Sequence, residues 1–397
     1  MKILFITQVF PYPPDSGGRI KTYETLKLLG KKHEVYLVCF SPKLLSREQE
    51  EKILKICRSI KVITSLIPFS QFKDIKPFIF RHLFSPMPFI VNRFRNKKME
   101  QIIKSLIKKE HFDAIHIDHI NMAWVLSLKK ECLWVLEEHN LESEIAWGIF
   151  RKEKWNKFKF FSLIEALKLN LFEKKMFSKF DWILAISPED KNKMVKMVIN
   201  EEKILFLPTA FKVKNLFKFK SLQKSPVILF VGMLSWWPNK DGFWWFYEKV
   251  FPLIKEAVAG VKLVVVGKEA DEKIIETGRN DKQLEIIGYA KDIDPYFESA
   301  NVFIAPLRSG SGIRIKILTA LSRGLPVVST KKGAEGIIQK SGPDLILADK
   351  PNDFAKAVIK LMKSKKMALK LSKEGIDFIR KDYNSQKAQK VLEKIYG

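Results

Sequence analysis

Cysteine, long apolar runs and acidic residues are all scarce in this sequence. The chain of 397 residues contains three cysteines, Cys39, Cys57 and Cys132, and none of them forms a CxxC pair. This excludes a disulfide framework and a thiolate zinc site. No run approaches the roughly 18 apolar residues of a membrane span, and the first apolar run is too short for the core of a signal peptide. We therefore expect a cytoplasmic protein that is soluble or peripherally bound at the inner face of the membrane.

The shortage of acidic residues leaves a net charge of +27, from 71 Lys and Arg against 44 Asp and Glu. Three segments hold most of the excess: residues 70–109 with ten basic and two acidic side chains, residues 151–180 with nine and three, and residues 350–397 with thirteen and five. The first two interleave their cations with phenylalanine, which suits an anionic membrane surface, where each Lys or Arg contributes about 1 kcal/mol. A lysine-rich genome would give the same totals. No nucleic-acid-binding module is recognised, so no nucleic acid partner is predicted.

Strand-like apolar runs alternate with helical patterns along the chain. In the first half, runs at residues 2–10, 33–40, 111–120, 132–140 and 180–190 indicate buried strands, and helices are predicted over 19–33 and 46–60. After a ragged polar stretch at 215–226, strands are predicted at 227–234, 261–267, 284–289, 301–307 and 325–330. Helices are predicted over 241–257, 273–278, 294–300 and 313–324, followed by a helical tail. This alternation predicts an α/β fold with two Rossmann-like, doubly wound parallel-sheet domains. Ligands of such sheets bind beyond the carboxyl ends of the strands.

A pair of glycines, Gly17 and Gly18, follows the first strand and precedes the first helix. Glycines there let backbone amides approach a phosphate at the positive end of the helix. A tight turn that needs positive φ is an equally good interpretation. The sequence has no GxGxxG in this turn, which argues against a dinucleotide cofactor.

A second glycine-rich loop lies in residues 305–330, APLRSGSGIRIKILTALSRGLPVVST. Gly310 and Gly312 follow a predicted strand, and Arg314 and Lys316 open the next helix. Cations sit poorly against the positive end of a helix, so two of them beside a glycine loop favour an anion between them. The alternative is a solvated basic helix start in a lysine-rich protein.

These motifs together resemble the retaining glycosyltransferases of family 4. The resemblance rests on the GG turn, on FVGMLSWWPNKDG and on GYAKDIDPYFESANVFIAPLRSGSGIRIKILTALSRGLPVVSTKKGAEGI, and it is strongest over residues 227–337. It is greatest with the branch that builds exopolysaccharides and cell-surface glycans. The resemblance implies the GT-B fold, in which two Rossmann-like domains face each other across a cleft. Residues 1–215 would bind the acceptor, residues 216–378 would bind the donor, and a helix within 379–397 would cross back to the first domain.

The resemblance also implies a reaction. A sugar would pass from a nucleotide-diphospho-sugar, a UDP- or GDP-sugar, to a glycan or lipid-linked acceptor with retention of anomeric configuration. Lys316 and Arg314, with the amides around Gly17 and Gly312, would stabilise the departing diphosphate. No cofactor and no metal ion are implied.

The donor loop departs from the family pattern at several positions. Ser311 and Thr319 stand where the family usually has two glutamates, and Ile313 lies between them in the same donor-binding segment. Thr319 offers a hydroxyl where a carboxylate would hold the ribose. Met233 replaces a frequent arginine, and Lys240 is the nearest basic substitute.

On the acceptor side, Asp118 and His119 end a predicted strand where the family places a histidine or an acid near the donor sugar. We take both as catalytic candidates, and Glu138 and His139, which end the next strand, as acceptor-side candidates. Other functions remain open from sequence alone: a nucleotide-sugar epimerase or hydrolase of the same fold, or a non-catalytic nucleotide-sugar binding protein.

Overall fold

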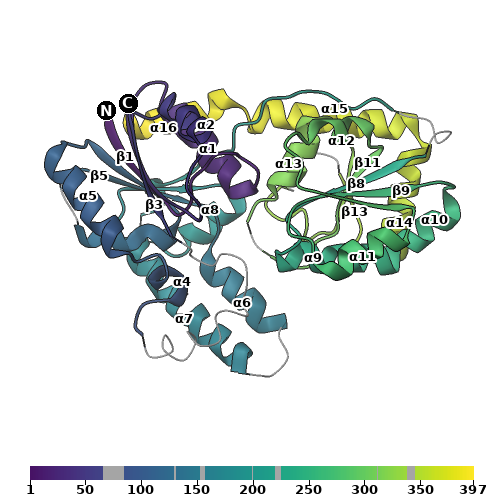
Figure 1. Ribbon diagram of the computed structural model, residues 1–397, viewed down its shortest axis with the longest axis horizontal. Coiled ribbons are helices and arrows are strands. Elements are labelled where there is room, and N and C mark those ends of the chain that lie inside the picture. Colours follow the sequence, from purple (N-terminus) through teal and green to yellow (C-terminus); the bar gives the residue numbers. More distant parts are fainter. Residues whose placement is uncertain are drawn as a thin grey trace. The chain divides into compact units, whose positions relative to one another are not determined.

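The computed structural model describes residues 1–65, 85–128, 131–152, 157–198, 200–219, 225–310, 312–337 and 345–397 (Figure 1). The chain divides into two compact units. Unit 1 comprises Met1–Ala210 and Ser385–Gly397, and unit 2 comprises Phe211–Asn384. The sequence places these boundaries after residues 215 and 378, a few residues away from where the structure places them.

Unit 1 is built on a seven-stranded parallel sheet with the order β3-β2-β1-β4-β5-β6-β7. The strands are β1 (Lys2–Thr7), β2 (Glu34–Ser41), β3 (Ser59–Thr64), β4 (Ala114–Asp118), β5 (Leu133–Glu138), β6 (Trp182–Ala185) and β7 (Ile204–Phe206). The helices are α1 (Gly17–Leu29), α2 (Arg47–Leu54), α4 (Phe89–Asn92), α5 (Lys97–Lys109), α6 (Glu142–Lys152), α7 (Lys157–Phe177), α8 (Pro188–Val195), α16 (Ser385–Tyr396) and the 3-10 helices η2 (Ile120–Leu128) and η3 (Glu201–Lys203).

The apolar strands of unit 1 are buried because helices cover both faces of the sheet. In β1, Leu4 and Ile6 join one core cluster, while Ile3 and Phe5 join another. Successive strand residues point to opposite faces, so these two clusters are the cores on the two sides of the sheet. The last helix, α16, packs Ala388, Leu392, Ile395 and Tyr396 into the second cluster.

Unit 2 is built on a six-stranded parallel sheet with the order β10-β9-β8-β11-β12-β13. Its strands are β8 (Val227–Val231), β9 (Lys262–Val266), β10 (Leu284–Gly288), β11 (Val302–Ala305), β12 (Val327–Ser329) and β13 (Ile346–Leu347). Its helices are α9 (Trp237–Trp245), the π-helix η4 (Phe246–Val250), α10 (Phe251–Ala257), α11 (Glu272–Asn280), α12 (Asp294–Ser299), α13 (Ile315–Ser322), α14 (Pro351–Lys363) and α15 (Lys365–Asp382). The two parallel sheets confirm the predicted α/β class with two Rossmann-like domains.

Two predicted helices have different bounds in the structure. The helix predicted over 46–60 is wrong in its second half, since α2 ends at Leu54 and β3 begins at Ser59. Among the described strands β3 pairs only with β2, and as a half-exposed edge strand it lacks the fully apolar run of the inner strands. The helix predicted from residue 241 begins earlier, at Trp237, with Pro238 in its first turn, where proline needs no hydrogen-bond donor. None of the helices in the described ranges is long and apolar enough to cross a membrane.

Candidate functional site

Three parallel strands of unit 1 end side by side and bring their last polar residues together. In register, Thr7 of β1 lies beside Asp118 of β4, and Asp118 lies beside Glu137 of β5. All three side chains are fully buried. The carboxyl ends of neighbouring parallel strands lie at the same edge of the sheet. The sequence predicts candidate functional side chains at this edge, and the structure places Asp118 there.

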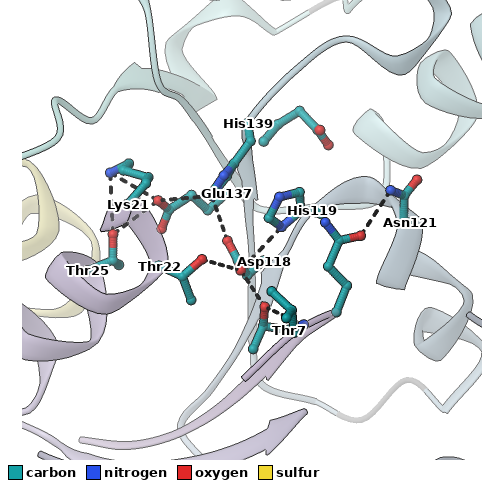
Figure 2. A network of polar contacts seen from close by, with 12 residues as sticks. Thr7, Lys21, Thr22, Thr25, Asp118, His119, Asn121, Glu137 and His139 are labelled. Atoms are coloured by element: carbon teal, nitrogen blue, oxygen red, sulfur yellow. Dashed lines mark hydrogen bonds and ion pairs between the residues drawn. The ribbon is translucent and has the colours of Figure 1, made fainter. Parts of the chain in front are cut away.

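Asp118 is the centre of a buried polar network (Figure 2). Its Oδ2 accepts hydrogen bonds from the hydroxyls of Thr7 and Thr22, at 2.6 and 2.8 Å. His119 Nδ1 lies 3.2 Å from the same oxygen, and His139 Nε2 lies 2.8 Å from Oδ1. Burial opposes the charged carboxylate, but the charges and hydrogen bonds of the two histidines hold the pKa of Asp118 well below its usual range.

His119 adopts a backbone conformation that is rare for a residue with a Cβ atom. Its φ is +76°, which costs of order 1 kcal/mol and is typically retained where a side chain must be aimed. Its N–H donates to the carbonyl of Glu137 at 2.8 Å, and its carbonyl accepts from Met122 N–H at 3.0 Å. These bonds hold the strained residue at the end of β4.

The rings of His119 and His139 lie against each other, with centroids 3.8 Å apart and 34° between their planes. Burial lowers the pKa of His119, but the neighbouring Asp118 carboxylate outweighs burial, so that the pKa of His119 is raised. Burial and then the charge of His119 lower the pKa of His139. The two pKa values shift in opposite directions, so His119 holds a proton more strongly than His139 does.

Glu137 is a buried residue that the sequence analysis did not select. Its Oε1 lies 3.0 Å from Lys21 Nζ and accepts from the Thr25 hydroxyl at 3.0 Å, and its Oε2 lies 3.2 Å from His116 Nε2. His116 Nδ1 in turn lies 2.7 Å from the hydroxyl of Tyr396 in α16. Burial opposes ionisation, but Lys21 and then His116 lower the pKa of Glu137 to about 2.

A sequence signal for this ion pair exists, although it is weak. Lys21 and Thr25 are one helical turn apart and share a face of α1, and that face is buried. A lysine on the buried face of a helix needs a carboxylate opposite, and Glu137 is the acid that ends a central strand.

Glu138, an acceptor-side candidate, holds the turn after β5. Its carboxylate accepts from Ile120 N–H at 2.8 Å and from Asn140 N–H at 3.4 Å. Burial, followed by the charges of Glu142 and Glu173, raises the pKa of Glu138 well above its usual range. The structure thus brings His139 to Asp118 and directs Glu138 to the backbone of η2. Their predicted acceptor contacts stay predictions.

Gly17 and Gly18 are the first residues of α1, and neither has positive φ. The alternative interpretation, a turn that requires positive φ, is therefore not what the structure contains. A Cβ atom on Gly18 would lie 3.8 Å from His139 Nδ1. The start of α1 thus lies beside the histidine pair, and the side chain of Ser16 at the N-cap makes no capping bond.

In unit 2, Lys316 of α13 reaches the end of β8. Its Nζ donates to Asn239 Oδ1 at 2.6 Å and lies 5.0 Å from the centre of the Phe230 ring. A Cβ atom on Gly232 would come within 2.5 Å of this Nζ and 2.7 Å of Asn239 Nδ2, so any other residue here would displace the lysine from its position. Burial and then the charge of Arg314 lower the pKa of Lys316 to about 7.

Arg314 is buried at the N-cap of α13. Its Nη1 donates to the carbonyl of Gly312 at 3.0 Å, and its guanidinium lies 6.0 Å from the Trp236 ring. Gly310 and Gly312 have φ of +102° and +76°, which side chains with a Cβ atom rarely adopt. Ile313 is buried in the same loop, and the predicted donor residue Ser311 lies outside the described residues.

The other two predicted donor residues have partners within unit 2. The Thr319 hydroxyl donates to the carbonyl of Ile315 at 2.8 Å in its own helix. Lys240 forms an ion pair with Asp271, the N-cap of α11. Their roles toward a nucleotide stay predictions.

Asp118, His119 and His139 also have the composition of a metal site. One ligand atom from each lies within 4.8 Å of the others. A metal ion would need both rings neutral, whereas the raised pKa of His119 favours a proton there, and Asp118 Oδ2 is already occupied by two hydroxyl donors. The donor set fits a protonated His119 better than a metal ion, and the absence of a metal stays a prediction.

Similarities to known proteins agree with this architecture. Residues 225–364 match the family described as Glycosyl transferases group 1. An uncharacterized 44.6 kDa protein in the cps region of Klebsiella pneumoniae is 25% identical over 396 residues, which is 97% of each chain. An uncharacterized glycosyltransferase of Methanocaldococcus jannaschii is 23% identical over 239 residues, which is 56% of this chain and 60% of that protein.

Solved structures share the fold over nearly the whole chain. Sucrose-phosphate synthase from Thermosynechococcus elongatus superposes with a TM-score of 0.69 at 14% identity, covering 100% of this chain and 98% of that one. HepE of Anabaena in complex with UDP gives a TM-score of 0.67 at 11% identity, with 99% of each chain covered. Together these similarities support a glycosyltransferase with the GT-B fold.

Proposed function

We propose that this protein is a retaining hexosyltransferase of glycosyltransferase family 4, acting in the synthesis of cell-surface polysaccharide or glycolipid. It takes a sugar from a UDP- or GDP-sugar and transfers it to a glycan or lipid-linked acceptor at the cytoplasmic face of the membrane. The bond between the anomeric carbon and the diphosphate breaks, and a bond from that carbon to the acceptor oxygen forms on the same face. The acceptor proton passes to the departing phosphate oxygen, so no covalent nucleophile is required.

One observation carries this proposal: the environment of Lys316. Within the described chain no carboxylate lies at ion-pair distance from its Nζ, and a second buried cation, Arg314, further lowers its pKa. Two cations that destabilise each other at a strand end favour the binding of an anion. A nucleotide diphosphate has the negative charge that would pair with these two cations.

Unit 1 supports the complementary part of the reaction. Its network around Asp118 already balances its own charge with the histidine pair. Such a site is suited to neutral hydroxyl groups, which donate to and accept from imidazole and carboxylate. We assign Asp118 and His119 to the transferred sugar, and Glu138 and His139 to the acceptor side.

The relatives are consistent with a UDP-sugar donor and a polysaccharide product. HepE has been solved with UDP-glucose, and TarM of S. aureus with UDP and alpha-GlcNAc-glycerol. The K. pneumoniae relative is encoded in a cps region. These are properties of those proteins, and they suggest which substrates to test first.

The test begins with a thermal-shift panel of UDP-, GDP- and ADP-sugars, followed by product analysis with lipid-linked acceptors. We expect one nucleotide class to stabilise the protein and Lys316→Met to abolish that shift. Lys255→Met is the matched control, because Lys255 also lies 5.0 Å from a phenylalanine ring in unit 2 but is paired with Asp281. Lys255→Met should retain the shift.

A second variant separates binding from turnover. His119→Ala should keep the nucleotide shift and lose transfer. Stabilisation without any transfer in the wild-type protein would favour a non-catalytic binding protein, and release of free sugar without acceptor would favour a hydrolase. No shift with any nucleotide sugar would contradict the proposal.

A further inference from the structure

The outward face of helix α7 is apolar over three turns. Phe160, Leu167 and Leu171 are exposed by 56%, 50% and 70%. With 3.6 residues per turn, these positions lie within a narrow arc of the helix surface, and the half-buried Leu163 and Ile164 flank them on the same side. We call these five residues the α7 stripe. A surface helix normally places polar residues on this side.

The stripe is distinct from the face by which α7 packs into the core of unit 1. The opposite side of the helix buries Phe161, Ala166, Leu169, Met176 and Phe177. Figure 1 shows α6 and α7 side by side, extending from the rest of unit 1. The stripe therefore lies on the side of α7 that faces away from its own unit.

The acidic residues of α7 are buried, whereas those of a surface helix are normally exposed. Its two glutamates, Glu165 and Glu173, are both buried. Glu165 accepts from Phe89 N–H at 2.7 Å, and Glu173 accepts from Ser143 N–H at 3.0 Å. The outward face of α7 consequently carries no negative charge.

Lysines lie at the C-terminal end of the stripe and along one side of it, where Lys168 also pairs with Glu165 at 3.7 Å. Lys174 and Lys175 are exposed in the last turn of α7, directly beyond Leu171, and Lys168 borders the stripe on one side. Exposed Arg151 lies near the end of the neighbouring helix α6. Apolar side chains flanked by cations are typical of helices that lie in the interface of an anionic bilayer.

We propose that the α7 stripe docks this protein onto an anionic lipid surface, with its apolar side chains between the headgroups and the lysines against lipid phosphates. Charge decides between this occupant and a second copy of the chain. Two copies joined through this face would bring like charges together in a protein with net charge +27. The inference extends the membrane location in the proposed function, but it can be tested without catalysis.

The experiment is sedimentation of the full chain with vesicles at about 150 mM salt. Vesicles of phosphatidylcholine alone are compared with vesicles in which phosphatidylglycerol makes up roughly a third of the lipid. We expect the wild-type protein to sediment with the anionic vesicles. The double variant Leu167→Glu/Leu171→Glu should lower the partition coefficient at least about tenfold, since it removes apolar insertion and adds charge of the wrong sign.

A matched control exists in the same unit. Leu44 and Leu54 are exposed by 85% and 52% and lie outside α7, so Leu44→Glu/Leu54→Glu makes the same chemical change elsewhere. It should sediment like the wild type. A third variant, Lys174→Glu/Lys175→Glu, should weaken binding to anionic vesicles while leaving the stripe intact.

Thermal unfolding and the nucleotide shift are measured on every variant, so a loss of lipid binding is separated from misfolding and from failure of donor binding. Wild-type protein that does not sediment with anionic vesicles would overturn the inference. So would a stripe variant that sediments like the wild type, or one that changes only the oligomeric mass in light scattering.

Discussion

Replacing Lys21 by methionine should destabilise unit 1 in a way that depends on pH. Lys21 and Glu137 form an ion pair at 3.0 Å, with side-chain exposures of 2% and 0%. Removing the lysine leaves Glu137 buried with two imidazoles nearby, His116 at 3.2 Å and His139 at 3.8 Å. A buried carboxylate that loses its cation costs far more than a broken surface pair.

The size of the effect follows from the pKa of Glu137. Lys21 contributes most to lowering it from 4.5 to about 2, and a shift of this size corresponds to about 3 kcal/mol. Measurements on other broken buried pairs give about 3–5 kcal/mol. For a unit of this length the melting temperature should fall by about 6–12 °C at pH 7.

The pH dependence has a defined sign. A carboxylate with a lowered folded pKa stabilises the protein above its unfolded pKa of 4.5, and this contribution is lost between pH 4.5 and about 2. In Lys21→Met the pKa of Glu137 rises, so the variant gains relative stability as the pH falls and the carboxyl is protonated. The difference between the two proteins should therefore be largest at neutral pH and shrink toward pH 4.

Scanning calorimetry at pH 7 and pH 4 is the assay, since it can resolve separate transitions of the two units. Lys27→Met is the control: Lys27 lies on the same helix and pairs with Glu24 at 3.0 Å, but with 48% of its side chain exposed. We expect it to cost less than about 1 kcal/mol. A Lys21→Met protein that melts like Lys27→Met, or whose deficit is the same at both pH values, would refute the reasoning.

Three further predictions concern the two strand-end sites. Because the pKa of Lys316 is about 7, the amine is about nine-tenths neutral at pH 8. Binding of UDP at pH 8 should therefore be accompanied by uptake of close to one proton. Titration calorimetry in buffers of different ionisation enthalpy measures this uptake, and a value of zero would contradict the prediction. Gly232→Ala should weaken nucleotide binding at least about tenfold by displacing Lys316 and Asn239, whereas Gly148→Ala, where a Cβ atom meets nothing within 4 Å, should leave binding unchanged. A chelator should leave transfer unaffected, since the raised pKa of His119 opposes metal binding there; a loss that zinc restores would show that the cluster binds metal.

The fold could be predicted well wherever the strands are central in their sheets. Inner strands such as Ile3–Ile6 of β1 are buried on both faces, so they read as continuous apolar runs. Strand β3 was missed because it is an edge strand in which Ile63 is buried while Lys61 and Thr64 are exposed. The residues before it form the charged helix α2, and the helical spacing of apolar residues continues into β3, so the predicted helix was too long.

The site was predictable at the level of strand ends and no further. Asp118, His119 and His139 stand directly after apolar runs, which is a local signal. The roles of Lys21 and Glu137 depend on a contact between α1 and β5, and Lys240 meets Asp271 across unit 2. Pairings between residues distant in sequence produce no periodic pattern. The sequence alone therefore could not show that Lys240 is paired with an acid whereas Lys316, in the part of the chain that the structure describes, is not.

The charge at the two strand-end sites differs in a way that explains the proposed division of labour. In unit 1, Asp118 and Glu137 already have cationic partners in Lys21 and the histidine pair, so an anionic ligand would gain little there, and a sugar hydroxyl could exchange with one hydrogen bond at small cost. In unit 2, the amide oxygen of Asn239 is the hydrogen-bond partner of Lys316 among the described residues, so a diphosphate would supply a counter-charge there. The basic residues of this protein therefore fall into two separate groups: exposed lysines such as those of α7, and the pair Arg314 and Lys316. Nucleotide binding should depend on this pair even where the surface lysines are neutralised.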